Sequence, residues 1–222
     1  MLTACIFSAC NTEGSLPLGI TQEMVTASKG KLVTDSGITF NLTNSSSTFD
    51  LTHGRYWATC EIMDMKSETE YDVRLTALEP AISPDILVLS QIPEGKLGTD
   101  PICIHEDFWL SGNYINMRNS HFCLPDSDGT HAVNLVFDDI RSHDDSLFFI
   151  LSHNSHGEKP DNPEYKDKTF ALTSYFTSVS FKDYIPAGSS KFIVTLDWKW
   201  YTNAEYEIKD YTKSAKYEIK LY

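Results

Sequence analysis

Alternation of apolar and polar residues with a period of two most constrains the fold of this 222-residue chain. In residues 191–201 every second side chain is large and apolar: Phe192, Val194, Leu196, Trp198 and Trp200. Most positions of the other phase are charged or carry a hydroxyl, as at Lys191, Thr195, Asp197 and Lys199. This pattern predicts a β-strand with one buried and one solvated face. Residues 215–221 repeat it. Both strands are expected to be antiparallel, because strands of a parallel sheet read as unbroken apolar runs.

Further strands are expected along the whole chain, and no segment has a compelling helical pattern. Residues 31–34 and 38–43 flank Asp35-Ser36-Gly37, which predicts a hairpin with glycine at a positive-φ position. Four strands within about sixty residues of the first half indicate a small barrel. The other expected strands span 56–63, 70–78, 132–138, 146–152, 169–181 and 205–209.

Proline and glycine concentrate between residues 84 and 101, which separates the two sets of strands. Such punctuation is typical of a domain boundary, and we place it near residue 95. The expected organisation is therefore an amino-terminal segment 1–19, a barrel domain 20–94 and a second β domain 95–222.

The segment 1–19 changes abruptly from small and apolar residues to polar and turn-forming ones, as at the end of an export signal. Ser8-Ala9 before Cys10 resembles a bacterial lipoprotein box, in which small residues precede a cysteine that is acylated. Cys5 fits the box in residue type, but the polar run after Cys10 is typical of a flexible tether, so Cys10 is the expected lipidation site. The alternative is two unmodified cysteines near a poorly ordered end.

Cys60, Cys103 and Cys123 cannot all pair within one chain. Cys103 and Cys123 flank an expected hairpin, so they are the candidates for a single disulfide. The alternative is three buried thiols that act as small hydrophobic side chains. No Cys-x-x-Cys occurs, which excludes a zinc ribbon or a thioredoxin-like motif.

The formal net charge is −13, and it is spread over the chain: residues 1–95 carry 5 basic against 12 acidic side chains, and residues 96–222 carry 13 against 19. Nucleic acids are bound by lysine and arginine that displace counterions, so an acidic surface excludes them as expected partners. No apolar run reaches the roughly 18 to 20 residues of a membrane-spanning helix. Contact with a membrane is expected through the lipid anchor only.

Chemical motifs are sparse. His153-Asn-Ser-His156 could bind a metal if both rings faced one way, but at a strand end they should diverge, so no metal site is expected. Asp126-Ser-Asp128-Gly129 is interpreted as a turn rather than a calcium loop. Gly-x-Ser-x-Gly is absent, and paired carboxylates fall on the solvated faces of strands. We expect no catalytic residue and no cofactor.

The phase of Trp198 and Trp200 with Leu196 predicts that both rings belong to the core rather than to a sugar-binding platform. The opposite face of that strand carries Lys199 and Tyr201, which form the candidate contact surface.

Residues 107–117, Asp-Phe-Trp-Leu-Ser-Gly-Asn-Tyr-Ile-Asn-Met, together with residues 132–137 and 192–201, resemble the NigD-like family of Bacteroidales envelope lipoproteins. The resemblance covers most of the chain after residue 20. It implies an all-β fold in which a small amino-terminal OB-like barrel precedes a carboxyl-terminal antiparallel β-sandwich. It also implies a lipid anchor in the outer membrane, on the periplasmic or the surface face, and it brings no catalytic residues. The chain departs from the family in having few acidic residues after Cys10.

These observations favour a non-enzymatic, lipid-anchored binding protein that recognises a protein or peptide. Bacteriocin immunity or accessory secretion is the role that the resemblance implies. Two alternatives stay open: an assembly protein that pairs with another chain through an edge strand, and a carbohydrate-binding module.

Overall fold

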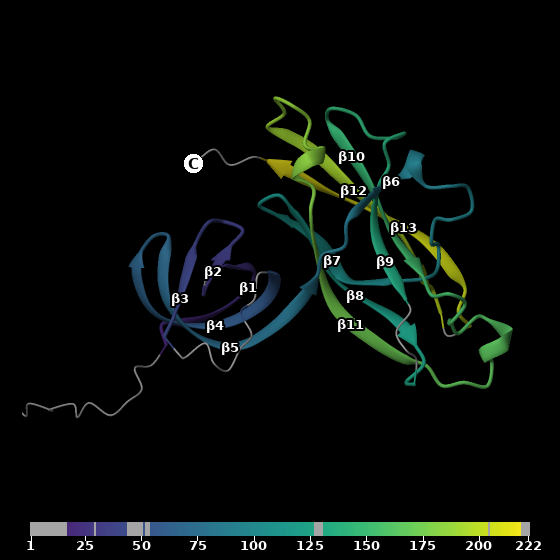
Figure 1. Cartoon of the computed structure of the whole chain (residues 1–222), viewed down its shortest axis with the longest axis horizontal. Helices are drawn as coiled ribbons and strands as arrows, with labels where there is room; N and C mark the ends of the chain where they lie inside the picture. The colour runs from purple at the N-terminus through teal and green to yellow at the C-terminus, as the bar shows by residue number, and fades with distance from the viewer. Residues whose placement is uncertain are drawn as a thin grey trace, which may run out of the picture.

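The computed structural model describes residues 17–28, 30–43, 51, 54–126, 131–203 and 205–218. Within these ranges the regular structure consists of strands and short 3-10 turns, so the expected all-β fold is confirmed (Figure 1). The first five strands are β1 (Gly19–Ser28), β2 (Lys31–Thr34), β3 (Thr39–Leu42), β4 (Gly54–Ser67) and β5 (Glu70–Ile82). The others are β6 (Ile86–Val88), β7 (Cys103–Ser111), β8 (Tyr114–Cys123), β9 (Ala132–Phe137), β10 (Ser146–Asn154), β11 (Ala171–Ser180), β12 (Lys191–Tyr201) and β13 (Ile208–Glu218).

Strands β1 to β5 close into a barrel. β1 pairs with β2 and β4, β2 pairs with β3, and β5 joins β4 to β3, so the strands return on themselves in the order of an OB-like barrel. The turn between β2 and β3 is the predicted hairpin, with Gly37 at φ +85°. The core of the barrel contains side chains of β4 and β5, which include Ala58, Cys60, Val73 and Leu75.

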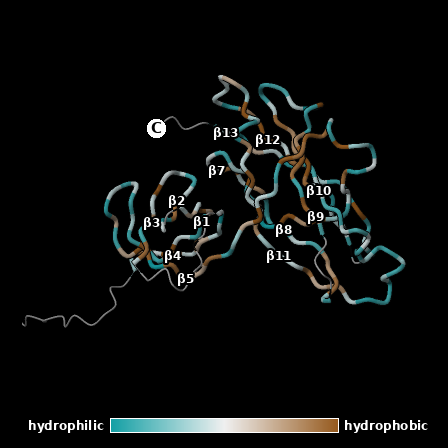
Figure 2. Tube along the Cα trace, in the orientation of Figure 1, coloured by the Kyte–Doolittle hydropathy of each residue, from teal (hydrophilic) through white to brown (hydrophobic). Residues whose placement is uncertain are grey.

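The second half of the chain forms a β-sandwich. One layer is the sheet β11-β8-β7, and the other is the five-stranded sheet β13-β12-β10-β9-β6. Alternating side chains from both layers meet in one core, which includes Ile115, Met117, Phe149, Phe181 and Leu196. Figure 2 shows hydrophilic residues concentrated in the loops around this sandwich.

The barrel and the sandwich share a sheet. β5 continues past the barrel and pairs in parallel with β11 at Ala81 and Ile82, so eight strands form one sheet that runs from the barrel into the sandwich. This junction is visible in Figure 1, where β5 leads from the barrel toward β8 and β11. β6, at residues 86–88, already pairs with β9 in the five-stranded sheet. The boundary near residue 95 stays a prediction.

The proline- and glycine-rich stretch packs into the sandwich at residues 97–102, which we call the wedge segment. The backbone N–H of Asp100 donates to His153 O of β10 at 2.9 Å, and that of Ile102 donates to Lys199 O of β12 at 2.7 Å. β10 and β12 pair directly only over residues 146–150 and 193–197. The wedge segment therefore bridges these two strands where they separate.

Some local expectations differ from the structure. β10 and β12 run parallel, although β12 was expected in antiparallel pairs only; its antiparallel partner is β13. Residues 205–209 and 215–221 were expected as two strands, but β13 runs unbroken over 208–218. Tyr206, with φ 60°, sits in the turn that precedes it. β1 lies where no strand was expected. In the described ranges no helix is long and apolar enough to cross a membrane.

Candidate functional site

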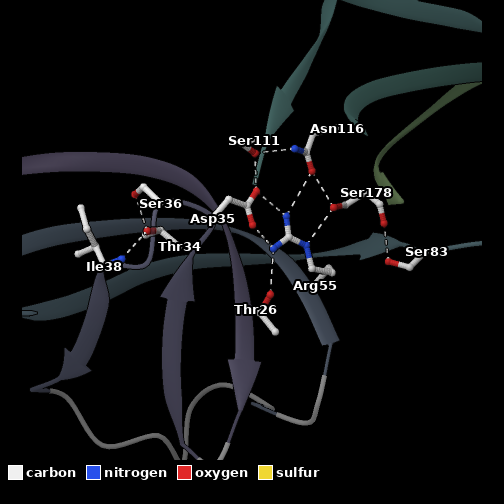
Figure 3. Close-up of polar contacts among 10 residues, drawn as sticks. All are labelled: Thr26, Thr34, Asp35, Ser36, Ile38, Arg55, Ser83, Ser111, Asn116 and Ser178. Atoms are coloured by element: carbon white, nitrogen blue, oxygen red, sulfur yellow. Dashed lines mark hydrogen bonds and ion pairs between the residues drawn. The ribbon is translucent and has the colours of Figure 1, made fainter. Parts of the chain in front are cut away.

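A buried ion pair lies where the barrel meets the sandwich (Figure 3). Arg55 of β4 donates from Nη1 to Asp35 Oδ1 at 2.5 Å and from Nη2 to Asp35 Oδ2 at 2.9 Å, and each side chain is only 6% exposed. The fork geometry of the guanidinium allows this two-point contact with a carboxylate. Asp35 is in the hairpin turn after β2, so the pair forms within the barrel.

The remaining contacts of Arg55 reach into the sandwich. Its Nε donates to Ser178 Oγ of β11 at 2.9 Å, and Nη2 donates to Asn116 Oδ1 of β8 at 3.3 Å. Ser111 of β7 donates its hydroxyl to Asp35. The Tyr114 ring lies 3.8 Å from the guanidinium carbon. The positive charge of Arg55 is neutralised by Asp35, and these groups enclose the ion pair. We therefore interpret the network as a set of contacts that joins the barrel to the sandwich.

An open groove of about 340 Å³ lies at the sandwich, between the wedge segment and the strands β12 and β13. Its aromatic part is Trp198 stacked on Tyr211, with ring centroids 5.5 Å apart and both side chains partly exposed. Charged groups stand around these rings: Lys199 Nζ lies 3.6 Å from Asp210 Oδ1, and Asp197 accepts a hydrogen bond from Thr212 at 2.7 Å. The groove thus combines aromatic surface with paired charges.

The two residues of the predicted contact surface separate in the structure. Lys199 lines the groove. Tyr201 does not belong to that surface, because it is 7% exposed and its hydroxyl donates to Asp161 Oδ1 at 2.7 Å. Burial, together with the Asp161 carboxylate, raises the pKa of Tyr201. β12 pairs with β13 in unbroken register, so Tyr201 stays on the same face as Lys199. The physical reason for its burial is that Asp161 and Tyr206, whose ring centroid lies 5.2 Å from that of Tyr201, cover it on that face. Trp198 packs against the edge of the core, and Trp200 stacks on Phe122 with centroids 5.6 Å apart.

The candidate disulfide does not form: Cys103 and Cys123 are free thiols. They do flank the hairpin of β7 and β8, but the register places Cys103 opposite Ser120, three residues before Cys123. An offset of three residues moves the second thiol roughly 10 Å along the strand and onto the other face of the sheet, where no bridge can form. Cys10 lies outside the described residues, so its lipidation stays a prediction.

Three histidines gather at one end of the sandwich. His121 is on β8, His131 directly precedes β9, and His153 is on β10, and one ring nitrogen of each lies within 4.8 Å of the others. Their rings are 4.5 to 5.1 Å apart, centroid to centroid. His156, the other histidine of the His-x-x-His motif, is exposed and has φ 52°, so the two rings of the motif diverge as predicted.

Burial lowers the pKa of both His121 and His153 to about 4, and the neighbouring histidines contribute in the same direction. Both imidazoles are therefore neutral near pH 7, which is the form that binds metal ions. Sequence reasoning missed this group because its members come from two strands in different sheets and from the residue before a third strand. The sequence indicated His153 only as part of a motif with His156, and no pattern connected it to His121 or His131.

The carboxyl-terminal part of the chain matches a protein family. Residues 85–209, more than half of the chain, fit the model of the NigD-like C-terminal β-sandwich domain. No curated protein matches the sequence.

Solved structures share the fold over nearly the whole chain. A NigD-like immunity protein from Bacteroides caccae has a TM-score of 0.65 at 15% identity, with 91% of this chain and 99% of that chain covered. A protein of unknown function from Bacteroides vulgatus has a TM-score of 0.64 at 20% identity, with 91% and 92% covered. A protein named as a candidate lipoprotein from Bacteroides fragilis has a TM-score of 0.60 at 16% identity, with 91% and 99% covered. At such identities these structures establish the fold only. With an OB-like barrel in front of the sandwich that the family model matches, the chain belongs to the NigD-like family.

Proposed function

We propose that this protein is a non-enzymatic binding protein of the bacterial cell envelope, anchored to the outer membrane by lipid on Cys10, which recognises a protein or peptide. The observation that carries the binding role is the groove beside β12 and β13. Its volume of about 340 Å³ lies in the range of ligand sites. Tryptophan and tyrosine at the centre of a surface, ringed by charged groups, are the usual anchors of protein–protein contacts.

Charge supports a partner of a particular kind. The chain carries a net charge of −13, so a basic protein or peptide would be attracted over a distance and an anionic polymer repelled. Within the groove, the Trp198–Tyr211 pair offers a flat apolar surface next to the carboxylate of Asp210. We infer that the bound segment presents an apolar side chain to the rings and a basic group to the rim. Immunity to a secreted peptide is one form of this function, and it accords with the name of the Bacteroides caccae structure.

Site-specific cross-linking tests the binding role. A photoreactive residue in place of Asp210, whose side chain is 83% exposed, is expected to capture a partner in the native envelope. The same residue in place of the exposed Thr76 of the barrel is the matched control and should not. Tyr211→Ser should weaken capture at least about tenfold, since aromatic anchors dominate binding energy. Tyr165→Ser, which changes another half-buried tyrosine, should leave capture unchanged. Equal capture from positions 210 and 76, or capture that the Tyr211→Ser substitution leaves unchanged, would contradict the proposal.

The anchor has its own test. Cys10→Ser should abolish incorporation of labelled fatty acid and release the protein from the membrane fraction, and Cys5→Ser should change neither. Labelling that persists in the Cys10 variant but disappears in the Cys5 variant would assign the lipid to Cys5.

A second function, assembly by strand pairing, is favoured by one observation. β13 is an 11-residue strand at the end of the five-stranded sheet, with β12 as its partner on one side. Its lysines, at positions 209, 213 and 216, are the kind of residue that protects an edge against pairing. We therefore place it second.

Proline substitutions at Lys213 and Ser214 separate the two functions. Adjacent backbone N–H groups point to opposite sides of a strand, so only one of these prolines removes a donor that faces away from β12. Loss of the partner with the proline that removes the donor facing away from β12, while the Tyr211→Ser variant still binds, would favour assembly. Capture of a neutral glycan in place of a protein would favour the carbohydrate-binding alternative.

A further inference from the structure

The histidine group at the end of the sandwich spans its two sheets. His121 belongs to the sheet that contains β8, and His153 to the sheet that contains β9 and β10. All three side chains are secluded from solvent: His121 and His153 are 8% and 2% exposed, and the His131 side chain is 4% exposed. Three imidazoles therefore lie in van der Waals contact, buried where the layers meet. What has to be explained is which ring nitrogens carry a hydrogen and which present a lone pair to their neighbours.

The contacts fix which nitrogen of His153 carries a hydrogen. Its Nδ1 lies 2.9 Å from the carbonyl oxygen of Pro101, which can only accept, so Nδ1 donates. A neutral His153 therefore presents a lone pair on Nε2. That lone pair faces His131 Nδ1 at 3.0 Å.

His131 cannot satisfy both of its neighbours as a neutral ring. Its Nδ1 would need a hydrogen to donate to His153, and its Nε2 faces Glu158 Oε1 at 3.3 Å. Nε2 makes no hydrogen bond within the described residues, because the contact with Glu158 is outside hydrogen-bond geometry. A neutral imidazole has one N–H and one lone pair, so one of the two contacts would place a lone pair against another lone pair.

A metal ion removes the conflict. If an ion takes the place of the hydrogen between His131 Nδ1 and His153 Nε2, both nitrogens use their lone pairs, and His131 keeps a hydrogen on Nε2 for Glu158. Glu158 is itself oriented by the backbone N–H of Leu124, at 2.6 Å from Oε1. A carboxylate or a carbonyl that holds the second nitrogen of a histidine is the usual outer partner of a metal-binding ring.

His121 completes the set. Its Nδ1 is 3.2 Å from the Tyr175 hydroxyl, which leaves Nε2 available as a ligand atom. His153 and His121 thus each have one nitrogen hydrogen-bonded to an oxygen outside the group and the other available within it, and His131 has Nδ1 within the group and Nε2 beside Glu158.

We propose that His121, His131 and His153 bind a divalent transition-metal ion of the zinc class, which joins the two sheets of the sandwich. Imidazole nitrogens suit Zn²⁺, Cu²⁺ and Ni²⁺, whereas Ca²⁺ and Mg²⁺ require oxygen ligands. Zn–N bonds of roughly 2.0 to 2.1 Å in a tetrahedron put ligand nitrogens about 3.3 Å apart, close to the observed pair. The rings must turn about χ2 for their lone pairs to converge, which the broad χ2 torsion of histidine permits. The fourth position is left for water or a small ligand.

Titration of the metal-stripped full chain with Zn²⁺ tests the proposal. One equivalent should bind, as measured by calorimetry and elemental analysis. His121→Ala and His131→Ala should each weaken binding by more than the roughly 10- to 100-fold that the loss of an outer partner costs. The matched controls are His156→Ala, which removes the other half of the sequence motif, and His143→Ala, whose side chain is 62% exposed; both should bind as the unaltered protein does.

Two further measurements keep the outcome clear if an alanine variant fails to fold. X-ray absorption of the zinc-loaded, unaltered chain should show three imidazole ligands. Glu158→Gln, which keeps an oxygen to accept from Leu124 but removes the charge, should weaken zinc binding roughly 10- to 100-fold. Absence of saturable binding, fewer than three imidazoles at the zinc, or loss of binding in the His156 variant would each overturn the proposal.

Discussion

A guanidinium with 6% of its side chain exposed depends entirely on partners within the protein. Arg55 has them: a two-point contact with Asp35 and hydrogen bonds to side chains of both the barrel and the sandwich. Removing one member of such a pair leaves an uncompensated charge away from water, which costs more than the pair itself contributes.

Arg55→Ala is therefore expected to lower the free energy of unfolding by about 3–5 kcal/mol, because Asp35 loses its counter-charge in a buried position. Urea denaturation followed by tryptophan fluorescence measures the change. Arg74→Ala removes a pair with Glu61 on the barrel surface, where water screens the charges, and should leave stability unchanged. A loss no larger for Arg55 than for Arg74 would contradict this interpretation.

Cys60 gives a pH-dependent prediction at the same scale. Burial in the barrel, and to a smaller extent the charge of Glu23, raises the pKa of its thiol from 9.0 to about 12. The folded state therefore favours the protonated thiol. This contribution to stability is complete below pH 9 and is lost as pH rises from 9 toward 12.

Alkylation by iodoacetamide followed by peptide mass spectrometry should accordingly modify the partly exposed Cys123 well before Cys60 at pH 8. Addition of urea to the unfolding midpoint should remove the difference. Equal rates in the folded protein would show that Cys60 is accessible.

At the scale of elements, the wedge segment requires a glycine. A Cβ on Gly98 would lie 2.6 Å from the backbone oxygen of His153, which cannot move without disturbing β10. Gly98→Ala should cost about 1–3 kcal/mol of stability, as expected for overpacking against a rigid neighbour. Gly19→Ala is the matched control, since nothing lies within 4 Å of its Cβ position. Thermal unfolding of the two variants measures the difference, and equal melting temperatures would refute the steric argument.

Sequence alone predicted the elements whose pattern is local. The alternation at Phe192–Leu196 and the turn at Gly37 are both present as expected. β1 was not predicted because Thr21, Gln22 and Glu23 interrupt its apolar face; its pairing with β2 and β4 makes it a strand. The burial of Tyr201 also depends on neighbours outside β12, because Asp161 and Tyr206 cover its ring.

The candidate sites were predicted less well, for the same reason. Lys199 was placed on a contact surface by strand phase, but the groove beside it is formed with the wedge segment, which no pattern connects to β12. The three histidines become neighbours only when the two sheets stack.

At the scale of the whole molecule, the barrel and the sandwich are joined by backbone pairing of β5 with β11 and by the Arg55 network. Calorimetry of the unaltered chain is expected to show one unfolding transition for both parts. Two separate transitions in the unaltered chain would show that the shared sheet does not couple the parts.

The double variant Arg55→Met, Asp35→Leu removes the charges together, and it should recover much of the stability lost in Arg55→Ala.

The wedge segment lies between the two candidate sites. Residues 97–100 line the groove, and the next residue, Pro101, supplies the carbonyl that orients His153. Any occupant that displaces this short stretch of backbone would also rotate an imidazole on its far side. By thermodynamic reciprocity, an ion held there would change the affinity for that occupant by the same factor as the occupant changes the affinity for the ion.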